Sequence, residues 1–194
     1  MMKNAALPDS ETGVIHGRFQ VLHDDHLVYL LAGLALCRHL VVGITNPDPS
    51  LTRDDNADLK RSSPSANPLT YFERYLTVRA VLSEAGVEPS RFSVVPFPIN
   101  IPKLYRYYVP LDALFFLAIY DEWGKRKLDR FRALGLKTHV LREVPESQKG
   151  ISASDIRSRM VRGEPWEGMV PPSVALLMKK WDIPGRLKEM GECP

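Results

Sequence analysis

The chain has 194 residues, of which 44% are hydrophobic and 25% are charged, and its net charge is +3. This length is enough for one domain with a full core, the composition is that of a soluble globular protein, and no apolar run approaches the roughly 20 residues that span a bilayer. A mild positive charge without a basic stripe does not indicate a nucleic-acid partner. The first dozen residues lack the apolar segment of a signal peptide. We therefore expect a cytoplasmic protein that binds neither membrane nor nucleic acid; no pattern decides whether it forms a homo-oligomer.

Apolar segments of two types alternate along the chain. Compact, β-branched runs predict strands, and runs with apolar residues at helical spacing predict helices. The predicted strands are 13–17, 40–44, 92–96, 112–120 and 138–141, and the predicted helices are 26–37, 70–86, 127–134, one that starts at Ser152, and 172–181. Two of these helices begin with a capping-box pattern, Thr70 with Glu73 and Ser152 with Asp155.

Strands that alternate with helices indicate a parallel sheet. We predict an α/β fold, a single Rossmann-like doubly wound parallel sheet of about five strands with helices on both faces and a C-terminal helical segment. Residues 1–12 are expected to be a flexible N-terminus, 13–181 the single domain, and 182–194 a C-terminal tail. The segment from Asn46 to Pro68 is an unusually long loop rich in Pro, Asp, Asn and Ser, which suggests a lid. Ligands of such sheets bind at the carboxyl ends of the strands.

The first candidate segment is HGRFQVLHDDH, residues 16–26, which leads from the first strand into the first helix. A helix N-terminus offers unpaired amide N–H groups and the positive end of the helix dipole, so it favours phosphate. His23 and His26 can both face such an anion. The alternatives are a turn with surface histidines, or a zinc site, although Cys37 and Cys193 do not have the spacing that would support the zinc site.

The second candidate segment is GISASDIR, residues 150–157. Ser152 is a typical N-cap residue, and Ser154 and Arg157 lie within the next turn and a half. Their hydroxyl and guanidinium groups, together with the free amides, would form a second phosphate cradle. An ordinary capped helix would show the same pattern.

Together the two segments resemble the motifs of the HIGH-type nucleotidyltransferase superfamily, in the branch of the nicotinamide mononucleotide adenylyltransferases. That branch opens with GRFQPxHxxH and closes with an ISGTEIR-like box. Its NPFTAGER-like helix start is similar to NPLTYFER, residues 67–74, so the resemblance runs from about residue 14 to 181. It implies an enzyme that transfers a nucleoside monophosphate from a nucleoside triphosphate to a small phosphorylated or phosphonylated acceptor and releases pyrophosphate.

The resemblance also implies roles for individual residues. His23, His26 and Arg157 would be catalytic, and His26 would stabilise the charge of the transition state. The residues expected to bind the nucleotide or its triphosphate are Gly17, Arg18, Phe19, Gln20, Ser152, Ser154 and Arg74. Mg²⁺ would bridge the phosphates, and no side chain is assigned to it.

Two positions depart from the pattern of the family. Val21 stands where the family usually has proline, and Ala66 stands where related enzymes often have arginine. Lys60 or Arg61 of the long loop would substitute for that arginine, unless both are solvated loop charges.

The largest departure is PFPINIPKLYRYYVP, residues 96–110, which lacks the tryptophan that stacks on a pyridine ring in the adenylyltransferases. A remodelled acceptor pocket, a stacking tyrosine and ordinary core packing are competing interpretations. The candidate acceptor-binding residues are Asn100, Lys103, Tyr105, Arg106, Tyr108, Asp121 and Trp123. A solvated helix face would equally explain the two basic residues, and packing at a helix start would explain Trp123.

The segments GITNPDPS, residues 43–50, and YDEWGKRK, residues 120–127, look like those of cytidylyltransferase domains from phosphonate natural-product pathways in the same superfamily. We therefore predict transfer of CMP, or of AMP, to a small phosphonate or phosphate. The alternatives are a nicotinamide mononucleotide adenylyltransferase and a nucleotide-binding regulator without turnover. The sequence does not show which base or which acceptor is used.

Overall fold

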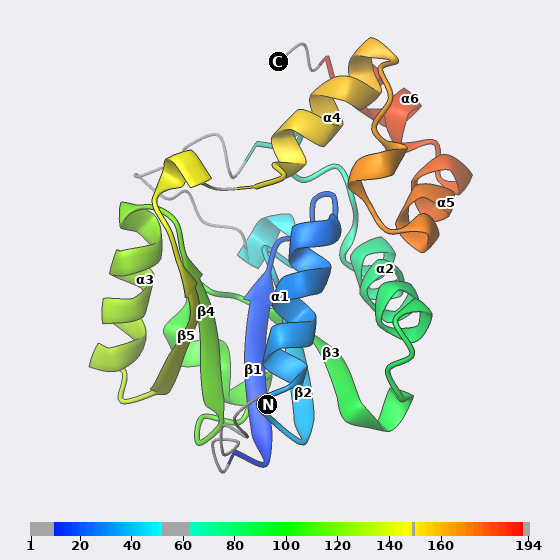
Figure 1. Ribbon diagram of the computed structural model, residues 1–194. Helices are drawn as coiled ribbons and strands as arrows, with labels where there is room; N and C mark the ends of the chain where they lie inside the picture. Colours follow the sequence, from blue (N-terminus) through cyan, green and yellow to red (C-terminus); the bar gives the residue numbers. More distant parts are fainter. Residues whose placement is uncertain (1–9, 52–62, 149, 192–194) are drawn as a thin grey trace.

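The computed structural model describes residues 10–51, 63–148 and 150–191. Five parallel strands form one sheet in the order β3-β2-β1-β4-β5 (Figure 1). The strands are β1 (Thr12–Gly17), β2 (His39–Thr45), β3 (Phe92–Phe97), β4 (Leu114–Ile119) and β5 (Lys137–Glu143). The predicted α/β sheet is confirmed, and the direction of strand order reverses between β1 and β4, which is where ligands of such sheets bind.

Helices cover both faces of the sheet. The α-helices are α1 (Asp24–Leu34), α2 (Tyr71–Glu84), α3 (Glu122–Ala133), α4 (Ala153–Arg162), α5 (Pro172–Lys180) and α6 (Ile183–Glu189). The short 3₁₀ helices are η1 (Pro49–Leu51), η3 (Pro89–Arg91), η4 (Pro102–Tyr107), η5 (Glu146–Gln148) and η6 (Glu167–Met169). None of the described helices has the length and apolar character needed to cross a bilayer.

Side chains that alternate along the strands divide the core into two clusters. Ile15 and Phe116 point to the face covered by α1, α2 and the C-terminal helices, whereas Val14 and Phe115 point to the face covered by α3 and η4. The result is a three-layer domain in which the central strands β1, β2 and β4 are largely buried, whereas the edge strands β3 and β5 are partly exposed.

Three predicted helix features differ from the structure. Helix α3 starts five residues earlier than predicted, at Glu122, because the Asp121 side chain caps it by accepting from the Gly124 N–H at 2.8 Å. Ser152 does cap α4, but it accepts from Ser154, and the Asp155 carboxylate pairs with Arg159 instead of closing a capping box.

The segment predicted as a tail after residue 181 contains α6, whose Ile183 and Leu187 are fully buried. Apolar spacing over only seven residues is too short to show a helix reliably in a sequence. The middle of the predicted lid loop, with Lys60 and Arg61, lies outside the described residues, so the lid and the substitution for an arginine at Ala66 stay predictions.

The capping box of α2 also fastens α6 to the domain. Thr70 accepts from the Glu73 N–H at 3.2 Å, and the Glu73 carboxylate accepts from the Thr70 N–H at 2.8 Å. The same carboxylate receives two bonds of 2.8 Å from the Arg186 guanidinium. Burial by itself would raise the pKa of Glu73, but the hydrogen bonds from Arg186 and Thr70 outweigh it and lower that pKa.

Replacement of Glu73 by glutamine is expected to lower the free energy of unfolding at neutral pH by roughly 1.5–3 kcal/mol, because hydrogen bonds to a charged partner contribute about that much. A lowered carboxyl pKa stabilises the fold above the unfolded value of about 4.3, and this stabilisation is lost as the pH falls through the folded value. Urea unfolding at several pH values should therefore show a wild-type advantage that shrinks below about pH 4.

Glu122→Gln is the matched control, because the Glu122 carboxylate pairs with Lys125 on the surface and is 74% exposed. Equal losses of stability in the two variants would contradict the role assigned to Glu73.

Candidate functional site

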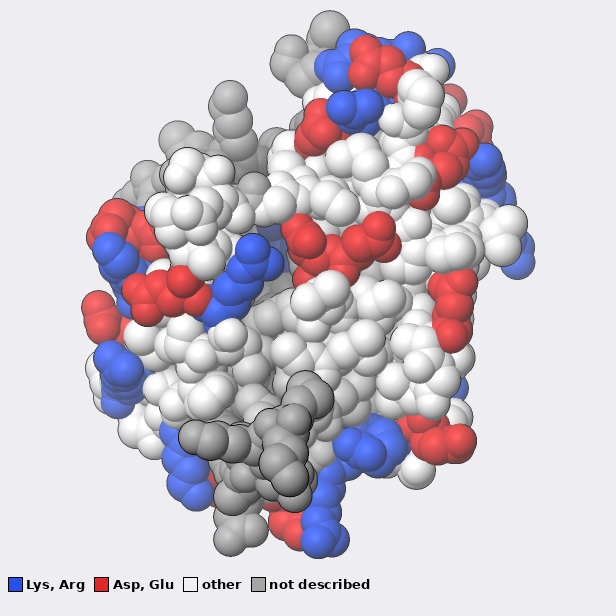
Figure 2. All heavy atoms as spheres, viewed as in Figure 1, with Lys and Arg blue, Asp and Glu red and all other residues white. Residues whose placement is uncertain are grey.

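A cavity of about 410 Å³ opens at the carboxyl edge of the sheet, where the strand order reverses between β1 and β4. The surface is hollowed between the α3–β5 side and the α1–α4 side, and charged side chains of both signs lie beside the hollow (Figure 2). The lining comprises His16, Gly17, Arg18, Phe19, Gln20, His23, Asp25, His26, Tyr29, Ala118, Tyr120, Asp121, Trp123, Gly124, Lys127, Gly150, Ile151, Ser152, Ala153 and Ser154. The N-terminal turns of α1, α3 and α4 therefore meet at one cavity, which favours an anionic ligand.

The two predicted histidines lie together in the first turn of α1. His23 is the N-cap residue, and the centroids of the His23 and His26 rings are 3.7 Å apart. The His23 backbone N–H donates to Nδ1 of His26 at 3.4 Å. A nitrogen that accepts this bond carries no proton, so the ring proton of neutral His26 sits on Nε2. His26 lines the cavity, and its predicted contact with phosphate stays a prediction.

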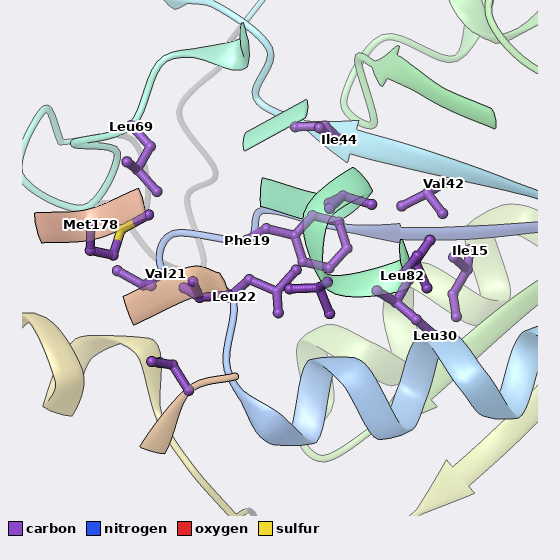
Figure 3. Close-up of a cluster of buried hydrophobic side chains, with 14 of the residues drawn as sticks. Ile15, Phe19, Val21, Leu22, Leu30, Val42, Ile44, Leu69, Leu82 and Met178 are labelled. Carbon is purple, nitrogen blue, oxygen red and sulfur yellow. The ribbon is translucent and has the colours of Figure 1, made fainter. Parts of the chain in front are cut away.

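Phe19, predicted to bind nucleotide, directs its side chain into the hydrophobic core instead. The ring is fully buried among Ile44, Leu82 and neighbouring apolar side chains (Figure 3). Phe19 has a φ of +53°, a left-handed conformation that is uncommon for a bulky residue. A Cβ at Gly17 would lie only 2.8 Å from the Phe19 ring, which explains why glycine occupies position 17. The side chain of Phe19 therefore anchors the turn, and its contribution to the cavity wall is limited.

The side chains of Gln20 and Arg74 form hydrogen bonds to the backbone around the cavity, and Gln20 also lines the cavity. Gln20 is 1% exposed and exchanges two hydrogen bonds with the backbone of Leu69, at 2.8 and 2.9 Å. The guanidinium of Arg74 donates to the carbonyl oxygens of Arg18, Thr45, Asn46 and Pro47. Burial, and next the charge of Arg18, lowers the pKa of Arg74 to about 10, so it remains charged at neutral pH.

Arg74 does not line the cavity that the described residues form, which agrees with a role in ordering the site, and direct contact with the triphosphate stays a prediction. With the bond from Nε to the Thr70 carbonyl at 3.2 Å, it has five carbonyl partners, which use the guanidinium donors that a phosphate would need. The Arg18 side chain does line the cavity, as predicted.

Arg157 of the second motif lies beside the cavity, and its predicted catalytic role stays a prediction. Its guanidinium donates to the carbonyl oxygen of Gln20 and, at 3.4 Å, to Oγ of Ser154. Arg157 is 6% exposed and lies outside the cavity lining of the described residues, whereas Ser152 and Ser154 are within that lining. The arginine thus connects α4 to the turn of the first motif and is placed to position Ser154.

A direct connection between the two motifs, which the sequence did not indicate, comes from Asp25. Its Oδ2 accepts from the Ile151 N–H at 2.7 Å. A Cβ at Gly150 would lie 2.1 Å from the same oxygen, so only glycine leaves room for this hydrogen bond. Asp25 lies between the two predicted histidines in the sequence. A negative charge next to an expected anion site is unusual, and this was the only signal in the sequence that Asp25 has a structural role.

Helix α3 supplies the opposite wall of the cavity. Trp123 lines it, and Nζ of Lys127 lies 4.5 Å from the centroid of the Trp123 ring. This is a cation–π contact that places a positive charge at the cavity. Asp121 also lines the cavity, but its carboxylate caps α3. Sequence reasoning noted the segment 120–127 without giving Lys127 a role.

Five predicted acceptor-binding residues do not line this cavity among the described residues, and they are Asn100, Lys103, Tyr105, Arg106 and Tyr108. The segment folds as η4 and its flanks, over the face that α3 also covers. Tyr105 is 2% exposed, packs on Phe97 with centroids 4.5 Å apart and donates to the carbonyl of Ile99, so the core-packing interpretation is the correct one. Tyr108 packs against the same cluster.

The remaining three have no place in the cavity wall. Lys103 and Arg106 are exposed, which agrees with the alternative of a solvated helix face, and Asn100 accepts from Arg130 at 3.3 Å. The prediction failed because the sequence of a Tyr-rich segment after a strand does not show its direction. The same residues would be expected whether the segment turns toward the carboxyl edge of the sheet, where ligands bind, or folds back over the face of the sheet.

Other lining residues that sequence reasoning did not assign are His16, Tyr29 and Tyr120. Burial, and next the charge of Lys127, lowers the pKa of His16 well below its usual value. The Tyr29 hydroxyl donates to the Phe116 carbonyl at 3.0 Å, and burial raises the pKa of Tyr29. The sequence did contain a signal for His16, because this residue lies at the end of the first predicted strand, directly before Gly17 of the first motif.

The arrangement suits the binding of a polyphosphate and the stabilisation of charge on it. Two histidines, Arg18, two serine hydroxyls and the amides of three helix starts face one cavity of nucleotide size. Among the described residues no group of three or more His, Cys, Asp or Glu side chains could hold a metal ion. A divalent cation would therefore fit here as a partner of phosphate oxygens.

This fold and this cavity define a nucleotidyltransferase of the HIGH-motif type, and the predicted enzyme class is confirmed by comparison with known proteins. The chain belongs to the nucleotidyltransferase family that includes phosphonoformate cytidylyltransferase and the nicotinamide-nucleotide adenylyltransferases. It is 50% identical over 177 residues to the phosphonoformate cytidylyltransferase of Streptomyces viridochromogenes, which covers 91% of this chain and 95% of that protein. It is 34% identical over 170 residues to the nicotinamide-nucleotide adenylyltransferase of Thermococcus onnurineus, covering 87% and 82%.

Solved structures show the same fold. A bifunctional NMN adenylyltransferase/ADP ribose pyrophosphatase of Francisella tularensis matches with a TM-score of 0.64 at 14% identity, over 91% of this chain. The present chain spans 52% of that chain, so about half of its length has no counterpart here. A structure of the Francisella protein contains AMP and a manganese ion. No protein-family model matched the chain.

Replacement of Gly150 by alanine is expected to lower turnover by roughly 10- to 100-fold, since small misplacements of binding groups cost about that much. The added methyl group would displace the Asp25 carboxylate and break its bond to Ile151. Pyrophosphate release measured beside a melting curve would separate a local from a global effect.

Gly168→Ala provides the control, because a Cβ at Gly168 would meet no atom within 4 Å. Wild-type turnover in Gly150→Ala would show that the link between the two motifs is not needed for activity.

Proposed function

We propose that this protein transfers CMP from CTP to a small phosphonate and releases pyrophosphate. The observation that carries the proposal is the convergence of both phosphate motifs on one cavity, in a chain half identical to a phosphonoformate cytidylyltransferase. The name of that relative supplies the acceptor class, which is a phosphonate that carries a carboxylate. The cavity has room for a nucleotide and a small acid and lacks a contribution from the Tyr-rich segment among its described lining residues.

The reaction follows from the placement of these groups. An ionised phosphonate oxygen attacks the α-phosphorus in line, a new P–O bond forms, and the bond from the α-phosphorus to the bridging oxygen breaks. The electron pair leaves with pyrophosphate, so no proton must be removed and no general base is required. The Nε2–H of His26 would donate to phosphoryl oxygens as charge develops, with His23 and Arg18 beside it.

The second motif would hold the leaving group. Ser152 and Ser154 line the cavity at the start of α4, where hydroxyl and amide donors suit the β- and γ-phosphates. Arg157 would fix Ser154 through the bond at 3.4 Å. Mg²⁺ carried on the triphosphate would neutralise part of its charge, since the described residues offer no separate cluster of metal ligands.

A nicotinamide mononucleotide adenylyltransferase is the second candidate. It is supported by the 34% identity to the Thermococcus onnurineus protein and by Trp123, an aromatic side chain in the cavity wall that could stack on a pyridine ring. A regulator without turnover is a third candidate with the same fold. It would not explain why the rings of His23 and His26 lie together at the cavity.

The function is tested by pyrophosphate release with CTP or ATP against a panel of acceptors. The panel contains phosphonoformate, 2-hydroxyethylphosphonate, aminopropylphosphonate and nicotinamide mononucleotide, each with Mg²⁺. We expect turnover with CTP and a phosphonate. Turnover only with ATP and nicotinamide mononucleotide would establish the second candidate, and binding of triphosphate without any turnover would support the regulator.

His26→Ala is expected to lower kcat by roughly 10²- to 10³-fold, the usual effect of removing one donor to a developing negative charge. His39→Ala is the matched control, because the His39 ring bonds Ser90 and Ser93 at the opposite edge of the sheet. Equal kcat values in the wild type and His26→Ala, with unchanged melting, would remove His26 from the catalytic site.

A further inference from the structure

The imidazole of His16 lines the cavity and packs against the rings of Phe97 and Phe131, which are called the apolar clamp below. It lies near the end of β1, is 5% exposed, and its ring lies 5.8 Å from that of Phe97 and 5.4 Å from that of Phe131. Because strand side chains alternate, His16 points to the same face as Val14, which is the face of α3. The histidine pair of α1 belongs to the other side of the sheet edge.

The imidazole has no hydrogen-bond partner for either ring nitrogen among the described residues. Buried polar groups in native proteins nearly always have partners, and an unpaired one is a candidate for contact with a ligand. His16 lines the cavity, so a bound molecule can reach it. The clamp of two phenylalanines fixes the orientation of the ring and leaves little freedom to find another partner.

Lys127 adds a positive charge on the same side of the cavity. It also lines the cavity, and its charge is near enough to lower the pKa of His16. Burial is the larger cause of that lowering, so the imidazole is neutral at physiological pH and offers one N–H donor. A directional N–H beside an ammonium group suits an acid group of a ligand better than an apolar or cationic one.

We propose that His16 is a specificity-determining residue that, with Lys127, binds the acid group of the acceptor that does not attack the α-phosphorus. This inference rests on the proposed function and narrows it to phosphonates that carry a second acid group, such as a carboxylate. The N-termini of α1 and α4 accommodate the triphosphate, so the acid group that reaches His16 on the α3 side belongs to the acceptor.

The experiment compares kcat/KM for phosphonoformate with that for methylphosphonate, which lacks the second acid group, at saturating CTP. The selectivity ratio is expected to fall roughly 10- to 100-fold in His16→Leu, the size of effect that one buried hydrogen bond to a charged group supports. His16→Gln keeps an N–H donor and should recover part of the ratio. The loss should appear in the KM for phosphonoformate more than in kcat or in the KM for CTP.

Two further variants make the result decisive. Lys127→Met should lower the same ratio, which keeps the test open if His16→Leu does not fold, and His39→Leu should keep the wild-type ratio. An unchanged ratio in folded His16→Leu overturns the inference, and so does a loss confined to the KM for CTP, which would assign His16 to the base. Failure of the wild type to use any phosphonate would overturn the proposed function instead.

Discussion

The hydrogen bond from the Ile151 N–H to the Asp25 carboxylate is the interaction on which the site depends. It joins the first turn of α1 to the segment that enters α4, across 126 positions of sequence. Together with the bond from Arg157 to the Gln20 carbonyl, it holds the two helix starts beside one cavity. Gly150 has to be glycine because a side chain there would occupy the position of the carboxylate oxygen. This arrangement places the negative charge of Asp25 beside the proposed site for an anion. The hydrogen bond from the Ile151 N–H stabilises that charge and so offsets the unfavourable arrangement.

Two buried guanidinium groups keep the turns around the cavity in place. Arg74 holds four carbonyl oxygens of the turns after β1 and β2, and Arg157 holds the carbonyl of Gln20. Carbonyls at the ends of parallel strands have no partners in the sheet, so a buried arginine there satisfies several acceptors at once. The proposed phosphate site thus rests on cations whose hydrogen bonds hold the surrounding backbone. Removal of such a cation would leave buried carbonyls unpaired, which affects the backbone of the site before it affects any ligand.

The fold was predictable from the sequence because its signals are local and agree with one another. Apolar runs, helical spacing and the Thr70 capping box each specify a short segment, and the parallel sheet follows from their alternation. The first and last motifs were also found, since a helix start next to a strand end is a local pattern. What failed was the direction in which a side chain points: Tyr105 is a core residue, and its sequence context looks the same as that of a ligand contact. Long-range partners such as Asp25 and Ile151 leave no local trace either, because their pairing exists only once the chain has closed.

The position of the cavity suggests how one fold accommodates different acceptors. The edge of the sheet separates two sets of residues, the phosphate-facing starts of α1 and α4 on one side and Trp123, Lys127 and His16 on the other. In the proposed function the first set holds groups common to every nucleoside triphosphate, so its chemistry need not change with the acceptor. The second set is built on α3 and the end of β1, where a substitution alters the wall without moving the hydrogen bond between Asp25 and Ile151. Selectivity for the acceptor can therefore change while the machinery of phosphoryl transfer stays in place.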